Sequence, residues 1–118
     1  MIFFSNPKAQ YLAYKNEIDA AIEKTLSGTQ FILGQNVASF EEEFAKYIGT
    51  DHVVGVGNGT DALCLALNAF DIGPGKEVIA PSYTAVATIA AIGMAGAIPV
   101  LVDVDPSYYT LSPEAIEK

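Results

Sequence analysis

Apolar residues in the first part of the chain recur every three or four positions, which is the period of an amphipathic helix. One such pattern runs over residues 10–26. A second helix is predicted to begin after Asn36, a typical N-cap residue, and to stop at Gly49. Phe31 lies in the loop between the two patterns. The sequence therefore predicts an N-terminal arm with two helices over residues 1–50.

From residue 52 onward the pattern changes to short apolar runs that alternate with helical segments. The runs typical of strands cover 52–56, 77–80 and 98–104, and the helical patterns cover 60–70 and 84–95. Continuous apolar strands are typical of a parallel sheet with both faces covered. The alternation is typical of the α/β class with right-handed crossovers. Residues 51–118 are therefore predicted to begin an α/β domain with a mainly parallel sheet.

Two features indicate that this α/β domain is incomplete. The segment Leu111–Lys118 begins a helix, with Ser112 as N-cap and Pro113 at the first helical position. It stops well short of the average helix length of about 11 or 12 residues. In addition, the helix predicted over 84–95 is apolar almost all round, and a helix of that kind is buried on every side. We expect the N-terminal part of a larger domain that has a partner subunit.

Composition narrows the class of protein. The formal net charge is −8, with six lysines and no arginine, which argues against a nucleic-acid partner. The acidic run 41–43 is interpreted as a solvated helix face. The single cysteine, Cys64, excludes an internal disulfide. No signal peptide is recognisable, and the longest apolar stretch, 85–98, is too short to span a bilayer. We expect a cytoplasmic protein without a membrane partner.

The glycine-rich turn Gly57-Asn58-Gly59 is the strongest indication of chemistry. It follows a predicted strand and precedes the helix that begins at Thr60 and Asp61. Such a turn leaves backbone N–H groups free, and the helix N-terminus adds roughly half a positive charge. Together these features predict an anion site, most often one for phosphate.

Other phosphate and metal motifs fit less well. The dinucleotide spacing G-x-G-x-x-G places Thr60, not glycine, at its third position, and no acidic residue follows the next strand. No Walker loop is present, and one histidine, His52, excludes a multi-histidine metal site. Asp103 and Asp105 lie at the C-terminal end of a predicted strand, where α/β sites cluster, but Asp105 before a proline is more simply a turn residue. A fragment of a nicotinamide-dependent oxidoreductase and a non-catalytic α/β binding module remain alternatives.

A second strand-to-helix junction, residues 80–84, leaves the predicted sheet beside the first one. It contains Tyr83, whose ring could stack on a planar ligand held at the Gly59-Thr60 turn. A phosphate cup and an aromatic ring are what a phosphorylated planar cofactor requires. The alternative is that Tyr83 is an ordinary half-buried aromatic residue of a loop.

Several motifs in this chain resemble one family in order and spacing. They are Phe31-Ile-Leu-Gly34, Phe40-Glu-Glu-Glu-Phe-Ala45, Asn58-Gly-Thr-Asp-Ala-Leu63, the segment 73–88 and the segment 96–106. The chain resembles the pyridoxal-phosphate-dependent sugar aminotransferases of the DegT/DnrJ/EryC1/StrS family over nearly its whole length. The resemblance implies the N-terminal portion of the type I aminotransferase large domain, preceded by two helices. It also implies a homodimer with the site at the subunit interface.

The resemblance further implies transfer of an amino group from glutamate to a keto group of a nucleotide-linked deoxysugar, with pyridoxal 5'-phosphate (PLP) as cofactor. By position, the N–H groups of Gly59 and Thr60, with the Thr60 hydroxyl, would hold the cofactor phosphate. Many members carry a ring-stacking aromatic where this chain has Ala85, and Tyr83 is the substitute that we predict. Phe31 is predicted to line the sugar site from across the dimer, with packing under the second helix as the alternative.

The resemblance also indicates what these 118 residues lack. The family's Schiff-base lysine, its aspartate for the pyridine nitrogen and its partner-subunit asparagine all lie beyond residue 118. The chain is therefore predicted to hold no catalytic residue and to be inactive alone. The motifs look most like the branch that acts on dTDP-linked 3-keto-6-deoxyhexoses, and the branch acting at C4 is the main competitor.

Overall fold

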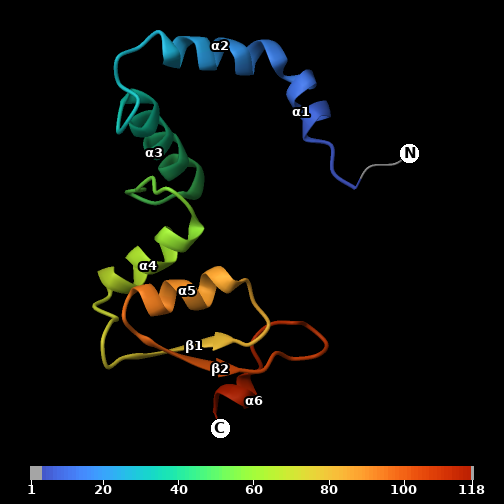
Figure 1. The fold of residues 1–118 in the computed structure, drawn as a ribbon, viewed down its shortest axis with the longest axis vertical. Helices are drawn as coiled ribbons and strands as arrows, with labels where there is room; N and C mark the ends of the chain where they lie inside the picture. The colour runs from blue at the N-terminus through green and yellow to red at the C-terminus, as the bar shows by residue number, and fades with distance from the viewer. Residues whose placement is uncertain (1–3, 118) are drawn as a thin grey trace. The chain divides into compact units, whose positions relative to one another are not determined.

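The structure is a computed structural model that describes residues 4–117. It divides into two compact units, the first of which runs to Gly55 while the second begins at Val56 (Figure 1). The first unit contains three helices, α1 (Pro7–Ala13), α2 (Lys15–Leu26) and α3 (Gln35–Ile48). The second contains α4 (Gly59–Ala69), β1 (Glu77–Pro81), α5 (Val86–Met94), β2 (Ile98–Val102) and α6 (Pro113–Ile116).

The single helix predicted over residues 10–26 is wrong, because the chain forms two helices there. The first begins earlier, with Pro7 in its first turn, and the side chain of Asn6 accepts the N–H of Ala9 at 3.2 Å. Tyr14 breaks the path with φ −116° and ψ 19°, values outside the helical range. The apolar spacing continues across this break, which is why periodicity did not reveal it.

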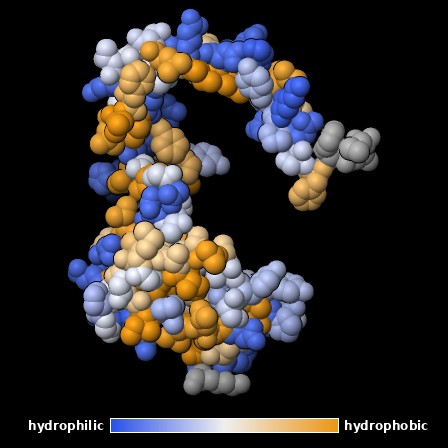
Figure 2. All heavy atoms as spheres, in the orientation of Figure 1, coloured by the Kyte–Doolittle hydropathy of each residue, from blue (hydrophilic) through white to orange (hydrophobic). Residues whose placement is uncertain are grey.

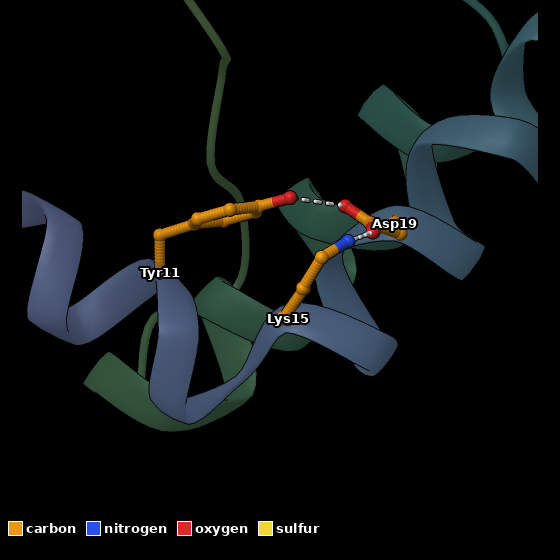
Figure 3. A network of polar contacts seen from close by, with 3 residues as sticks. All are labelled: Tyr11, Lys15 and Asp19. Atoms are coloured by element: carbon orange, nitrogen blue, oxygen red, sulfur yellow. Dashed lines mark hydrogen bonds and ion pairs between the residues drawn. The ribbon is translucent and has the colours of Figure 1, made fainter.

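A polar network joins α1 to α2 across the break (Figure 3). The Tyr11 hydroxyl donates to Oδ1 of Asp19 at 2.8 Å, and the Lys15 ammonium donates to Oδ2 of the same carboxylate. The ammonium also lies 5.5 Å from the centre of the Tyr11 ring. These contacts raise the pKa of Lys15 and lower the pKa of Asp19, with the hydrogen bond between the two groups as the main cause.

Helix α3 begins one residue before the predicted N-cap. Gly34 is the N-cap, while Asn36 instead donates through Nδ2 to Oγ1 of Thr25 at 3.0 Å. A Cβ at Gly34 would lie 2.9 Å from the carbonyl oxygen of Gln30, so the position accepts only glycine without a shift of the backbone. The predicted stop at Gly49 is confirmed, since its φ of 80° is left-handed.

The strand predicted over residues 52–56 is wrong for this structure, which assigns no strand there. The side chains still alternate as in an extended chain, since Val53 is partly buried and Val54 is 76% exposed. A strand is assigned from a ladder of backbone hydrogen bonds with a neighbour. Here the N–H of Gly55 instead donates to a side chain, Oε1 of Glu41, at 2.7 Å.

The second unit confirms the predicted α/β fold. Strands β1 and β2 pair in parallel, from Glu77 opposite Ile98 to Pro81 opposite Val102. Helix α5 connects them and lies over the sheet, and α4 packs beside α5 (Figure 1). The core of this unit is small. It consists of Ala80, Ile92 and Ala97, with Leu67, Ile72, Val78 and Ile89 packed against them.

Helix α5 starts two residues later and ends one residue earlier than predicted, and β2 ends at Val102 rather than at residue 104. Val104 forms an isolated antiparallel bridge with Leu111. The predicted cap of the last helix is confirmed, because the Ser112 hydroxyl accepts the N–H of Ala115 at 3.3 Å.

The sequence predicts that helix α5 is buried on every side, but in this structure one part of it is exposed. Ala91 and Ile92 are buried, whereas Val86 is 84% exposed and Met94 is 62% exposed. Hydrophobic residues are accordingly visible at the surface (Figure 2). A helix with this composition requires more cover than the described residues provide.

Candidate cofactor phosphate site

The turn that precedes α4 is built around one side chain, Asn58. Its backbone is extended, and Oδ1 accepts the N–H of Asp61 at 2.9 Å, so Asn58 is the N-cap of the helix. Its Nδ2 donates in return to Oδ2 of Asp61, also at 2.9 Å. The two side chains thus fix the first turn of α4 and hold the Asp61 carboxylate towards the cap.

The two glycines that flank Asn58 have different roles. A Cβ at Gly57 would lie 3.2 Å from Oδ2 of Asp61, so this glycine leaves room for the capping carboxylate. A Cβ at Gly59 would meet no atom within 4 Å. The space beside Gly59 is therefore open, as a site that receives a ligand must be.

The hydrogen bonds of this turn determine which N–H groups can bind an anion. Asp61 donates to the Asn58 side chain, and Ala62 donates to the Asn58 carbonyl at 3.1 Å. Among the bonds of the described residues, the N–H groups of Gly59 and Thr60 have no acceptor, as is usual in the first helical turn. With the helix dipole and the open space beside Gly59, two such donors can form an anion site suited to a phosphate group.

The second junction lies at the carboxyl ends of the paired strands. Ser82 extends the ladder by donating its N–H to the Val102 carbonyl at 2.8 Å, and its hydroxyl donates to Oδ1 of Asp103 at 3.4 Å. Tyr83 is 73% exposed and lines a hollow together with Ser82, Asp103, Val104 and Tyr109. That hollow contains no residue of the glycine turn. The sharing of one site by Gly59, Thr60 and Tyr83 therefore stays a prediction.

The two aspartates after β2 serve the local backbone. Oδ1 of Asp105 accepts the N–H groups of Ser107 at 2.7 Å and of Tyr108 at 3.1 Å, which confirms its role as a turn residue. Oδ1 of Asp103 accepts the N–H of Val104 at 2.9 Å. Residues 4–117 contain no group of three or more histidine, cysteine, aspartate or glutamate side chains that could hold a metal ion.

Comparison with known proteins identifies the family. Residues 13–118 match the sequence model of the DegT/DnrJ/EryC1/StrS aminotransferase family. The chain belongs to this family. The resemblance seen in the motifs is thus confirmed, and neither the oxidoreductase nor the binding-module alternative finds support among the matches.

Two characterised members of the DegT/DnrJ/EryC1/StrS family illustrate the relationship. The UDP-2-acetamido-2-deoxy-3-oxo-D-glucuronate aminotransferase of Pseudomonas aeruginosa is 42% identical over 117 residues, covering 99% of this chain and 33% of the relative. The dTDP-3-amino-3,4,6-trideoxy-alpha-D-glucose transaminase of Streptomyces venezuelae is 46% identical over 115 residues, covering 98% of this chain and 30% of the relative. The chain therefore spans about a third of the length of these relatives.

Two solved structures share the fold. The crystal structure of DesV from S. venezuelae matches with a TM-score of 0.92 and 45% identity, over 98% of this chain and 31% of that one. NtdA from Bacillus subtilis, solved with the cofactor PMP bound, matches with a TM-score of 0.84 and 30% identity, over 89% of this chain and 24% of that one. The described fold is therefore part of an aminotransferase fold.

Phe31, the residue predicted to line the sugar site, lies in the loop between α2 and α3. It is 63% exposed, and the next two residues, Ile32 and Leu33, are 84% and 80% exposed. Leu33 has a positive φ of 49°, an uncommon conformation for a leucine. The described residues of the first unit therefore do not bury Phe31, contrary to the alternative of packing under the second helix.

Sequence reasoning misses two side-chain arrangements. The reciprocal pair of Asn58 and Asp61 is one, although the spacing of a capping residue and an acid three positions later is a signal for it. Glu41 is the other. The sequence predicts a solvated face for the run 41–43, but Glu41 is partly buried and accepts the N–H of Gly55. No local signal separates Glu41 from its two neighbours.

No helix among residues 4–117 has the length and apolar composition needed to cross a membrane.

Proposed function

We propose that the protein carrying this chain is a PLP-dependent aminotransferase that moves an amino group from glutamate to the keto group of a nucleotide-linked sugar. One observation carries the proposal. In a chain of this family, the capped turn before α4 leaves the N–H groups of Gly59 and Thr60 without an acceptor among the described residues, and the space beside Gly59 is open. This arrangement fits the phosphate of PLP, and PMP, which is bound in the related NtdA, carries the same phosphate group.

The residues of this chain would bind and orient the cofactor. The N–H groups of Gly59 and Thr60 would donate to the phosphate oxygens, and the Thr60 hydroxyl would add a third hydrogen bond. Tyr83 is proposed to stack on the pyridine ring and Phe31 to line the sugar site of the partner subunit in a homodimer. The bound cofactor supplies an electron sink for the amino transfer.

The relatives' names support one position on the sugar. Both characterised relatives are named for a 3-oxo or a 3-amino sugar, one linked to UDP and the other to dTDP. We propose a keto group at C3 rather than C4, on a dTDP-linked 6-deoxyhexose. The motif segments around Phe31 and Thr84 favour dTDP, while the identity to the UDP-dependent relative makes UDP the competing nucleotide.

Turnover by the full-length protein tests the function. Purified protein with PLP and glutamate would be given a dTDP-linked 3-keto-6-deoxyhexose, its 4-keto isomer or a UDP-linked 3-keto sugar, and formation of 2-oxoglutarate would be measured. The first substrate is expected to give the highest kcat/KM. Preference for UDP or for C4 would correct the substrate, and absence of 2-oxoglutarate with all three would refute the function.

A further inference from the structure

The first turn of α4 carries a negative charge of its own, the carboxylate of Asp61. Asp61 is the third residue of the helix, after Gly59 and Thr60, and Asn58 is the N-cap. In a capping box, an acid at this third position turns back and accepts a backbone N–H at the start of the helix. The helix dipole also favours a negative charge there. The Asp61 carboxylate is therefore an anion attached to the chain beside a site that is proposed to receive one.

The contacts of Asp61 hold its carboxylate at the cap. Oδ2 accepts a hydrogen bond from Nδ2 of Asn58 at 2.9 Å, and a Cβ at Gly57 would lie 3.2 Å from the same oxygen. The carboxylate thus lies against Gly57, the residue before the cap. Among the described hydrogen bonds, none joins it to the N–H of Gly59 or Thr60.

The side-chain amide of Asn58 has two separate contacts with Asp61. Its oxygen accepts the N–H of Asp61 at 2.9 Å and so caps the helix. A cap needs only this acceptor, since serine and aspartate cap helices as well as asparagine does. The amide nitrogen is not needed for capping, so its contact with the carboxylate calls for a separate explanation.

We propose that Asn58 is a positioning residue for the phosphate of PLP, because its amide nitrogen keeps the Asp61 carboxylate away from the N–H groups of Gly59 and Thr60. Without this hydrogen bond, the carboxylate would compete with the phosphate for the same donors and would repel its charge. Competition would be strong, because a group attached to the same chain has a high effective concentration. All of these residues lie in the second unit, in one continuous turn of the chain. This inference rests on the proposed function, in which the turn binds the phosphate of PLP.

A double-mutant cycle in the full-length protein isolates this effect. Dissociation constants would be measured for PLP and for pyridoxal, which lacks the phosphate. Asn58→Ala is expected to weaken PLP binding about tenfold, the size of one charged hydrogen bond, and pyridoxal binding less than about twofold. Asp61→Ala removes the competing anion and should not weaken PLP binding. In the Asp61→Ala background, Asn58→Ala should weaken PLP binding less than about threefold, since only the helix cap is then lost.

Two further variants complete the experiment. Asn68→Ala is the matched control, because Asn68 is an exposed asparagine of the same helix, whose amide donates to Sγ of Cys64 at 3.8 Å. It should change neither affinity. Gly57→Ala replaces Asn58→Ala if that variant does not fold. Its Cβ would meet Oδ2 of Asp61, so it should displace the carboxylate and weaken PLP binding only where Asp61 is present.

The outcomes separate the two proposals. An equal loss of affinity for PLP and pyridoxal in Asn58→Ala overturns the positioning role, as does no loss, or a loss that is undiminished in the Asp61→Ala background. If the unaltered protein binds PLP more tightly than pyridoxal and one of these results is found, only the role of Asn58 is wrong. If the unaltered protein binds PLP and pyridoxal equally well, the phosphate site proposed for the turn is wrong as well.

Discussion

Asn58 uses both atoms of its side-chain amide within one turn of the chain. Its oxygen caps α4 and its nitrogen holds the Asp61 carboxylate. Replacing Asn58 by alanine is expected to destabilise the protein by about 1 kcal/mol, because an N–H at the helix start loses its acceptor. Thermal unfolding of the full-length protein measures the change.

Asn58→Ser is the control for this cap, since a hydroxyl oxygen can also accept the N–H of Asp61. It should be closer in Tm to the unaltered protein than Asn58→Ala is. Equal Tm values for the alanine and serine variants would show that the cap contributes no stability.

Part of the site can be predicted residue by residue. Gly59 and Thr60 lie in a local motif whose geometry depends on neighbours in sequence, and the structure leaves the space beside Gly59 open, as a ligand site requires. Glu41 could not be found in this way. Its role depends on a contact with Gly55, fourteen positions away. The spacing of residues along the helix does not show which of the three adjacent glutamates makes this contact. The hollow that contains Tyr83 likewise depends on β2 and Tyr109, which the sequence does not place.

At the scale of elements, the turn between α5 and β2 depends on Gly96. Its φ is 80°, and a Cβ there would lie 3.2 Å from Cδ of Pro74. Gly96→Ala therefore combines left-handed strain, about 1 kcal/mol or more, with a close contact to a rigid ring. The variant is expected to lower the free energy of unfolding, as measured by chemical denaturation.

Gly49 offers a matched comparison for Gly96. It has the same φ of 80°, but a Cβ there would meet no atom within 4 Å. Gly49→Ala should therefore destabilise the protein less than Gly96→Ala, by the strain alone, about 1 kcal/mol. A loss as large as that of Gly96→Ala would show that the contact with Pro74 is unimportant.

The network between α1 and α2 predicts a pH dependence. The pKa of Asp19 is lowered in the folded chain, so its contribution is complete above the unfolded value of about 3.9 and is lost as the pH falls through the lowered pKa. The pKa of Lys15 is raised, so its contribution is complete below about 10.4 and is lost as the pH rises through the raised pKa. The network therefore stabilises the helix junction between these limits.

NMR titration of the Asp19 carboxyl carbon checks this prediction. Its pKa should lie below the ordinary value and rise towards it in Lys15→Met, with a smaller rise in Tyr11→Phe, because Lys15 is the larger cause. An ordinary pKa of Asp19 in the unaltered protein would mean that the network does not form in solution.

The elements were predicted well where neighbouring residues determine them and poorly where a distant partner does. Gly49 and Ser112 end and begin helices through their own backbone or side chain, and both predictions are confirmed. The break at Tyr14 interrupts a continuous apolar period, so the period does not reveal it. The segment 52–56 has strand composition, but a strand needs a neighbour, and the described residues supply only the Glu41 carboxylate.

At the scale of the whole molecule, we propose that the residues that bind the cofactor phosphate and those that carry out the chemistry lie in different parts of the sequence. This chain spans about a third of its relatives, and the proposed role of its residues is to hold the cofactor phosphate. The 118 residues alone are expected to give no 2-oxoglutarate from glutamate and any nucleotide keto-sugar. A coupled dehydrogenase assay, with the full-length protein as positive control, measures this. Sustained turnover by the isolated chain would contradict the prediction.

The family and the α/β class could be predicted from sequence because several motifs occur in a fixed order. The choice of nucleotide and of C3 or C4 could not. The nucleotide and the keto group are recognised by side chains that come together in space from distant parts of a sequence. Of the candidate residues in this chain, only Phe31 is proposed to face the sugar. Two relatives of nearly equal identity carry different nucleotides in their names, which shows how little this part of the chain determines that choice.

The core beneath α4 and α5 also has a consequence for synthesis on the ribosome. All of its members lie between Leu67 and Ala97, so only short loops must close before they meet. Packing can therefore start once β2 has left the exit tunnel, while translation of any later codons continues. Because α4 carries the glycine turn at its N-terminus, the proposed phosphate site would begin to become ordered at this stage of synthesis.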